Sequence, residues 1–190
     1  MDRSWKIFLI VALAWSLSYI ISNAYVEKTA EGYINYHSSF DDLFPLIPFF
    51  VIIYISAYAL FFLPLFFEQE FKPYVFGLLS LAGITLLIFT IFPGIITRPQ
   101  LGTDIFSKIL AWIYSIDNPH NLFPSSHVSL SFFSACIMNN KWIYFWFALI
   151  AISTLLIKQH YIVDVIGGIA VGGLAYAIYR TQKKKVQGAK

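Results

Sequence analysis

Two short segments of the chain hold residue types that can move protons and bind phosphate. Residues 124–127 read Pro-Ser-Ser-His, and residues 160–164 begin with a histidine and end with an aspartate. Each segment lies where an apolar stretch meets a polar loop, and His or Asp is costly in a membrane helix, which favours a functional role. His160 and Asp164 are four residues apart, so on a helix the carboxylate can orient the imidazole.

Residues near these two segments favour the binding of an anion. Arg98 carries a permanently charged, forked donor group that suits phosphate oxygens, and Lys158 adds a positive charge next to His160. Ser125 and Ser126 are good N-cap residues for the helix that follows them, and a helix N-terminus presents free N–H groups to an anion. Together with the two histidines, these features predict a phosphoryl-transfer site.

The composition places these residues in a membrane protein. The chain has 190 residues, of which 58% are hydrophobic and 12% charged, and its mean hydropathy is +0.70. A soluble domain is nearer a quarter charged. Several apolar blocks are long enough to cross the roughly 30 Å of a bilayer's hydrocarbon core. The sequence therefore predicts an all-α integral membrane protein with a single membrane domain over residues 1–190.

The apolar blocks predict a bundle of six transmembrane helices, with a polar stretch from residue 93 to residue 126 between the third and the fourth. The fourth is short, so we expect its first turn to extend back through Ser125; five spans is the alternative. Glycines at 167–168 and 172–173 predict close helix packing in the last span. The six predicted spans are residues 7–23, 45–67, 74–92, 127–138, 142–157 and 162–179.

The distribution of charge predicts the orientation of the bundle. With both termini in the cytoplasm, nine of the 13 Lys and Arg residues lie inside and four outside, as the positive-inside rule expects. The basic tail, residues 180–190, is then cytoplasmic and the site extracytoplasmic. No basic surface is left over for nucleic acid. Residues 7–23 could be a cleaved signal peptide, but their long apolar core favours a retained helix.

The chemical segments resemble the three motifs of the type 2 phosphatidic acid phosphatase superfamily over about residues 90–170. The first motif of that superfamily ends in Arg-Pro, as at residues 98–99, and the second, Pro-Ser-Gly-His, is similar to residues 124–127. The third opens with a serine, here Ser153, and ends with the His160 and Asp164 pair. The motifs agree with the superfamily in order, spacing and predicted topology.

Three positions depart from the superfamily pattern. Ile91 replaces the lysine that opens the first motif, and Ser126 replaces the glycine of the second. Thr154 replaces the arginine of the third motif, and Lys158 is the candidate for the missing positive charge. These departures concern the contacts to phosphate, and with them the substrate, more than the two histidines.

The resemblance implies a six-helix enzyme that acts on a lipid phosphate ester or pyrophosphate, with neither a metal nor another cofactor. His160 would attack phosphorus to give a phosphohistidine, Asp164 would orient His160, and His127 would serve as the general acid and then the general base. The phosphate oxygens would be held by Arg98, Ser125, Ser126 and Lys158. The partners implied are the lipid substrate and the bilayer.

Two alternatives remain open at this point. The residues beside the motifs, 121–123 and 158–159, look closer to a branch of the superfamily that includes sphingomyelin and inositol phosphorylceramide synthases. Those enzymes transfer a phospho-headgroup to a lipid alcohol. A different class is a haem or quinone carrier with His127 and His160 as ligands, which an absorption spectrum would distinguish. Asp117 and Asn121 either order the loop before the second motif or form a turn. The sequence identifies neither the lipid nor the oligomeric state.

Overall fold

The computed structural model describes residues 3–29, 32–67, 71–117 and 119–188, although several side chains of the first helix lie outside the description. The described residues are mostly helical and contain no strand, only an isolated bridge between Ile34 and Gly94. The elements in chain order are α1 (Arg3–Thr29), η1 (Ser39–Leu43), η2 (Pro48–Phe50), α2 (Val51–Ile55), α3 (Ala57–Phe62), α4 (Pro64–Phe67), α5 (Phe71–Ile91), α6 (Ile105–Ile116), α7 (Ser126–Met138), α8 (Lys141–Leu156) and α9 (Ile162–Gly188).

Three helical segments in the described part of the chain are long and apolar enough to cross a membrane. They are Pro48–Phe67, Phe71–Ile91 and Ile162–Gly188, and they support an integral membrane protein. The helices α7 and α8 are apolar but shorter, and α1 covers the first predicted span as one continuous helix. An all-helical fold is therefore confirmed, whereas six crossings remain a prediction.

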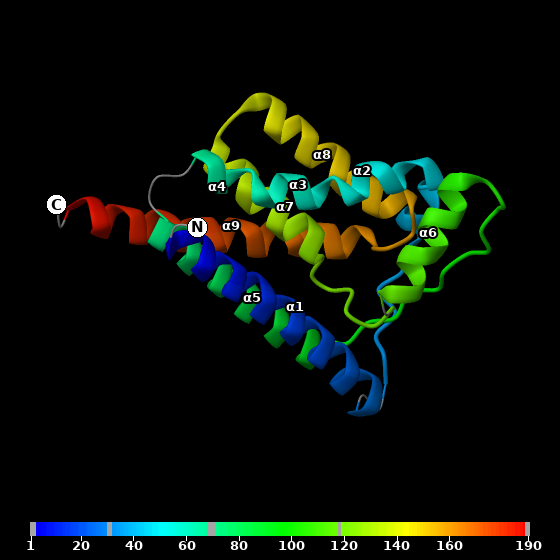
Figure 1. Ribbon diagram of the computed structural model, residues 1–190. Helices are drawn as coiled ribbons and strands as arrows, with labels where there is room; N and C mark the ends of the chain where they lie inside the picture. Colours follow the sequence, from blue (N-terminus) through cyan, green and yellow to red (C-terminus); the bar gives the residue numbers. More distant parts are fainter. Residues whose placement is uncertain (1–2, 30–31, 68–70, 118, 189–190) are drawn as a thin grey trace.

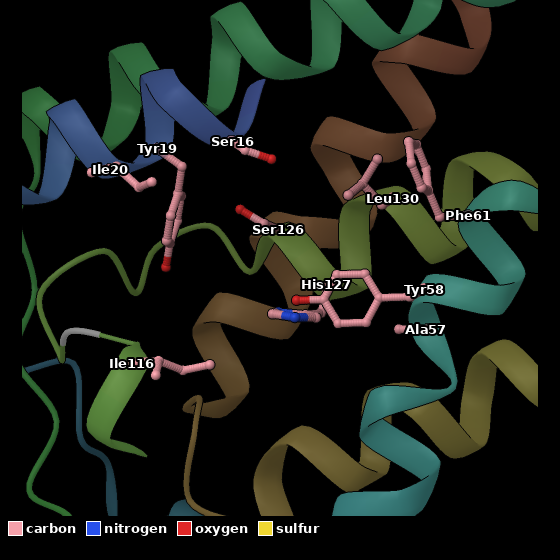
Figure 2. A pocket seen from close by; sticks show the side chains of 10 residues that line it. All are labelled: Ser16, Tyr19, Ile20, Ala57, Tyr58, Phe61, Ile116, Ser126, His127 and Leu130. Atoms are coloured by element: carbon pink, nitrogen blue, oxygen red, sulfur yellow. The ribbon is translucent and has the colours of Figure 1, made fainter. Parts of the chain in front are cut away.

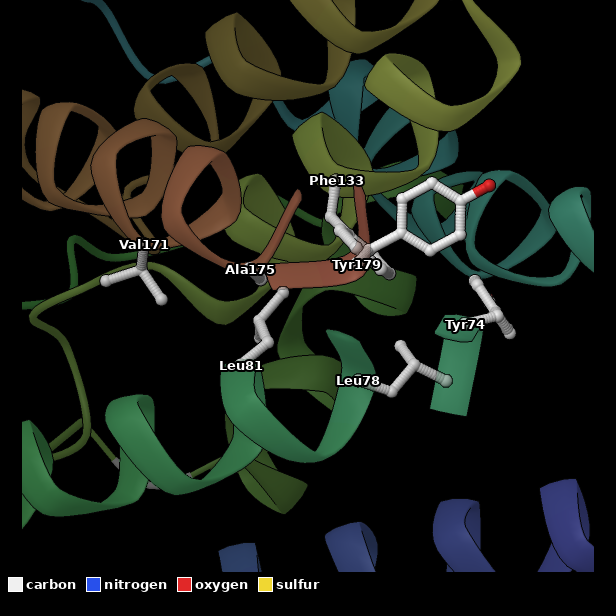
Figure 3. Packing of buried hydrophobic residues seen from close by; sticks show 7 residues of the cluster. All are labelled: Tyr74, Leu78, Leu81, Phe133, Val171, Ala175 and Tyr179. Atoms are coloured by element: carbon white, nitrogen blue, oxygen red, sulfur yellow. The ribbon is translucent and has the colours of Figure 1, made fainter. Parts of the chain in front are cut away.

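The helices pack as successive layers on either side of α9. On one side of α9 lies α5, which in turn contacts α1; on the other lies α7, which contacts α3 and α8 (Figure 1). Figure 3 shows one of the packed clusters, in which α5, α7 and α9 bury aromatic and aliphatic side chains against each other. Its members are Tyr74, Leu78, Leu81, Phe133, Val171, Ala175 and Tyr179.

Glycines allow α9 to approach α7 closely, as the paired glycines predicted. A Cβ atom added at Gly168 would lie 2.8 Å from the carbonyl oxygen of Ser125, and one added at Gly172 would lie 2.6 Å from that of Ser129. Real Cβ atoms essentially never come within 3.0 Å of such an atom. The start of α7, which carries Ser125 and His127, is therefore held directly against α9.

A helix occupies part of the stretch that was predicted to be a polar loop. Asp104 is the N-cap residue of α6, and its side chain accepts hydrogen bonds from the backbone N–H groups of Phe106 and Ser107. Leu110 and Ile113 of α6 are buried in a cluster with residues of α2 and the α8–α9 loop. The prediction missed α6 because its apolar residues recur at helical spacing over only 12 residues, too few for a span.

The loops that carry the three motifs gather at one end of the bundle. The segment from residue 93 to residue 126, the loop before α9 and α6 all lie at that end (Figure 1). Both termini lie toward the opposite end, where α9 extends farthest (Figure 1).

Candidate active site

His127 is the second residue of α7 and is enclosed by aromatic side chains. Ser125 is the N-cap residue, and its hydroxyl accepts a hydrogen bond from the N–H of Val128 at 3.3 Å, so the helix begins where the sequence predicted. The His127 Nδ1 atom lies 3.2 Å from the hydroxyl of Tyr54 in α2. Ring centroids of Tyr54 and Tyr58 lie 4.3 Å and 5.7 Å from that of His127. These contacts fix the orientation of the imidazole.

His160 and Asp164 lie on either side of the α9 N-terminus. The His160 Nδ1 atom is 3.4 Å from Asp164 Oδ2, and both side chains are buried. The same carboxylate oxygen accepts a hydrogen bond from the backbone N–H of Tyr161 at 2.8 Å. Asp164 therefore both caps its own helix and orients the imidazole.

The structure brings the second and third motifs together. The ring centroids of His127 and His160 are 6.4 Å apart. The backbone N–H of Ser125 donates to the carbonyl oxygen of Asp164 at 3.0 Å, which joins the start of α7 to the first turn of α9. In both imidazoles Nδ1 faces a partner, Tyr54 for His127 and Asp164 for His160. Nε2 is therefore the ring nitrogen that remains available to a substrate.

Arg98 is linked to this pair through Gln159. Its Nη1 donates to the carbonyl oxygen of Tyr114 at 2.6 Å and its Nη2 to Gln159 Oε1 at 3.1 Å. The guanidinium also lies over the Tyr114 ring, 4.4 Å from the ring centroid. Burial lowers the pKa of Arg98, although the nearby Asp117 carboxylate acts in the opposite direction. Arg98 thus joins α6 to the residue that precedes His160.

Lys158 lies close in sequence to His160, but its ammonium group is engaged elsewhere. It donates to the carbonyl oxygens of Asp41 and Phe44 in the loop around η1. The backbone of Lys158 has a φ of 52°, the left-handed conformation that a non-glycine residue rarely adopts. A contact between Lys158 and a phosphate at His160 would require the release of these carbonyl groups.

A small polar cavity lies between the two histidines. It measures about 10 Å³, the space of about one water molecule. Ser126 Oγ and both amide atoms of Asn121 are buried here without a hydrogen-bond partner among the described residues, as is Gln159 Nε2. Buried polar groups are usually paired, so this gathering indicates a polar ligand. The lining residues are Tyr19, Asp117, Asn121, Leu122, Ser126, His127, Gln159 and His160.

A larger and mostly apolar pocket reaches His127 from the side of the bundle. It measures about 440 Å³ and is formed by α1, α3, α6 and α7. Figure 2 shows Ser126 and His127 at the start of α7 facing this space, with Tyr19 reaching in from α1 and Tyr58 from α3. Tyr19, Ser126 and His127 line both cavities, so the two spaces adjoin at the His127 imidazole. The other lining residues are Ser16, Ile20, Ala57, Phe61, Ile116 and Leu130.

Several residues at the site carried no signal in the sequence. Tyr54 contacts His127 from 73 positions away, and Tyr19 donates a hydrogen bond to Asp117 from 98 positions away, at 2.7 Å. Such pairings follow from helix packing and not from any local motif. Gln159 had a signal because it directly precedes His160, and Asp117 and Asn121 because they lie in the loop before the second motif.

Metal-binding groups form no cluster in the described part of the chain. No three His, Cys, Asp or Glu side chains there are placed to hold one ion.

Comparison with known proteins gives one structural match for this fold. No protein-family model and no curated protein matches the chain. Among solved structures, the crystal structure of Aquifex aeolicus LpxE aligns with 87% of this chain and 93% of that chain. The TM-score is 0.52 at 17% sequence identity, so the likeness shows a shared fold.

Proposed function

We propose that the chain is a membrane lipid phosphatase of the type 2 phosphatidic acid phosphatase superfamily, acting on a lipid phosphate monoester or pyrophosphate. The observation that carries this proposal is the placement of His127 and His160, whose ring centroids are 6.4 Å apart beside a polar cavity. Asp164 accompanies the second histidine. The fold that the chain shares with Aquifex aeolicus LpxE agrees with this proposal.

The first half-reaction transfers the phosphoryl group to His160. The lone pair of His160 Nε2 forms the bond to phosphorus while the bond between phosphorus and the leaving oxygen breaks. Asp164 stabilises the positive charge that develops on the imidazole, since its carboxylate lies 3.4 Å from Nδ1. His127, as the imidazolium, gives its Nε2 proton to the leaving oxygen, which departs as the lipid alcohol or phosphate.

The second half-reaction returns His160 to its starting state. A water oxygen attacks phosphorus, and the electron pair of the N–P bond returns to His160 Nε2. His127 Nε2, now neutral, takes the proton of that water and becomes the imidazolium again. Inorganic phosphate leaves, and both histidines are as they began.

The phosphate oxygens require donors, and the site offers several. Arg98 Nε, Ser126 Oγ and Gln159 Nε2 are buried without a hydrogen-bond partner among the described residues. The first turn of α7 adds free backbone N–H groups, which favour an anion. Ser125 acts indirectly, since its hydroxyl already caps that turn. Lys158 joins them only if it leaves the carbonyl groups of Asp41 and Phe44.

The apolar pocket suits the hydrocarbon part of the substrate. It ends at His127, so a chain in this pocket brings a phosphate at its end to the His127 imidazole, beside the small cavity that His160 also lines. With the termini in the cytoplasm, the site lies at the extracytoplasmic face. Only four of the 13 Lys and Arg residues lie on that face in this topology.

The test is an assay of purified protein in detergent on a panel of lipid phosphates, with and without a lipid alcohol, in which free phosphate and new lipid are both measured. We expect free phosphate, loss of turnover in His160→Ala, inhibition by vanadate and full activity in chelator. Wild type should form a phosphorylated protein whose phosphate is acid-labile, and His160→Ala should form none. If new lipid forms without free phosphate, the reaction is transfer to the lipid alcohol and not hydrolysis. A haem or quinone absorption band with no turnover would overturn the proposal.

A further inference from the structure

Tyr54 holds the nitrogen of His127 that faces away from the substrate. Tyr54 lies in α2 and is 2% exposed, and its hydroxyl is 3.2 Å from His127 Nδ1. This is the one hydrogen bond that the described residues give to the Tyr54 hydroxyl. A buried hydroxyl without a partner is costly, so the contact constrains both groups. No motif includes Tyr54, which precedes His127 by 73 residues.

The two histidines therefore have partners of different charge at the same ring atom. His160 Nδ1 faces the Asp164 carboxylate, and His127 Nδ1 faces a neutral hydroxyl. An ionised carboxylate accepts hydrogen bonds only and stabilises a positive imidazole. A tyrosine hydroxyl both donates and accepts, so it can pair with Nδ1 in either protonation state without a charge of its own. The imidazolium beside Tyr54 is the less stabilised of the two and gives up its proton more readily.

We propose that Tyr54 is a positioning residue that makes His127 the general acid and general base of the reaction, while Asp164 makes His160 the nucleophile. This inference rests on the phosphatase function proposed above. The hydroxyl accepts from Nδ1–H throughout the cycle, which leaves Nε2 as the atom that exchanges a proton with the leaving group and with water. Both the proton that leaves and the proton that returns therefore pass through Nε2, and the hydroxyl of Tyr54 keeps its own.

Tyr54→Phe removes the hydroxyl and keeps the ring that packs against His127. General acid–base catalysis contributes about 10²–10⁴-fold, and we expect the variant to lose about 10- to 100-fold in kcat on an alkyl phosphate monoester. In the first turnover on an alkyl-substituted nitrophenyl phosphate, whose leaving group needs no proton, most of this loss should disappear, because the attack of water that also needs His127 comes later. Formation of phosphohistidine from that second substrate should persist.

Tyr74→Phe is the matched control. Tyr74 of α5 is as deeply buried as Tyr54. Its hydroxyl donates to the carbonyl oxygen of Phe61 in α3 at 3.0 Å, away from His127. This variant should keep the wild-type ratio of rates on the two substrates, whatever its thermal stability. In a His127→Ala background, Tyr54→Phe should cause no further loss on the alkyl phosphate. An equal loss on both substrates, or an additive loss in that background, would show that Tyr54 only supports the fold.

An NMR measurement tests the contact without any turnover. In protein with ¹⁵N-labelled histidine, the Nδ1 resonance of His127, assigned from His127→Ala, should shift in Tyr54→Phe and stay unchanged in Tyr74→Phe. An unchanged His127 Nδ1 resonance in Tyr54→Phe overturns the inference. If this resonance shifts but no lipid phosphate is hydrolysed by wild type, the proposed function fails and the catalytic role of Tyr54 fails with it, whereas the hydrogen bond itself is confirmed.

Discussion

Asp41 connects the loop around η1 to the segment that carries His160, through a hydrogen bond with Ile162, 121 residues away. Its Oδ1 accepts a hydrogen bond from the backbone N–H of Ile162 at 2.8 Å, in the first turn of α9. Its Oδ2 accepts from the backbone N–H and hydroxyl of Ser38 at 2.8 Å and 2.7 Å. Because Lys158 also binds the backbone carbonyl of Asp41, this one residue holds both sides of the His160 segment.

The stability of the protein should therefore depend on pH through Asp41. Burial alone would raise the pKa of Asp41, but the hydrogen bonds from Ile162 and Ser38, with His37 nearby, hold the pKa below its usual value. A carboxyl with a lowered pKa in the folded state stabilises the fold above its unfolded pKa of about 3.9, and this stabilisation is lost as pH falls through the folded pKa. Asp41→Asn replaces the oxygen that accepts from Ser38 by an NH2 group, so it should cost about 1 kcal/mol at pH near 6 and weaken the loss of thermal stability toward pH near 3.

Asp42→Asn is the control for this measurement. Asp42 is exposed and pairs with His37, so its change leaves the contacts to Ile162 intact. Thermal unfolding in detergent across the pH range compares the three proteins. If Asp41→Asn loses stability toward acid as steeply as wild type does, another group is responsible.

At the scale of helices, the contact between α7 and α9 sets the position of His127. Gly172 and Gly173 are neighbours in α9, but only one of them faces a backbone atom of α7. A Cβ atom at Gly172 would lie 2.6 Å from the Ser129 carbonyl oxygen, whereas one at Gly173 would lie 3.6 Å from the Phe132 ring, an ordinary contact. Gly172 therefore determines how closely the two helices approach.

This difference predicts opposite outcomes for two alanine variants. Gly172→Ala must push the helices apart and should cost about 1–3 kcal/mol, with a loss of activity because His127 moves with α7. Gly173→Ala should be neutral or stabilise by about 0.5–1 kcal/mol, because alanine favours a helix over glycine. Thermal unfolding and phosphatase rates of the two variants check this directly; equal behaviour would mean that the interface adjusts freely.

Most helices were predictable from hydropathy, because long apolar blocks have few alternatives in a membrane. The predicted span 74–92 is α5, and 142–157 is α8, each within three residues at both ends. The predicted span 45–67 is instead a series of short helical pieces, broken near Ser56 and Pro64. Hydropathy averages over such breaks. It also overlooked that α9 continues past residue 179 to Gly188.

The site was predictable only where its residues follow one another in sequence. Spacing alone gave the His160 and Asp164 pair, and the cap at Ser125 followed from residue type. Tyr54 and Asp41 reach the site through tertiary packing, which no local pattern records. Lys158 shows the converse, since its closeness in sequence to His160 did not reveal that its ammonium group binds the η1 loop.

At the scale of the whole molecule, the orientation that charge predicts in the membrane can be tested by direct labelling. Both termini lie away from the site end of the bundle (Figure 1). In a Cys136→Ala background, which removes the single cysteine, Thr103→Cys and Gln187→Cys place thiols at exposed positions of opposite ends. An impermeant maleimide applied to intact cells should label Thr103→Cys alone. Labelling of Gln187→Cys alone would put the chemistry on the cytoplasmic side.

The length of α9 makes the position of its ends sensitive to the thickness of the bilayer. Its 27 residues, at about 1.5 Å each, form a rod about 40 Å long, whereas the hydrocarbon core is about 30 Å thick. Asp164, buried at the candidate site, lies in its first turn and the exposed Lys185 in its last, so charged residues mark both ends. In a thicker or thinner bilayer the rod must tilt or the lipid must deform. His160 then changes depth relative to the headgroup phosphates, so turnover of one substrate should vary with the acyl length of the host vesicle.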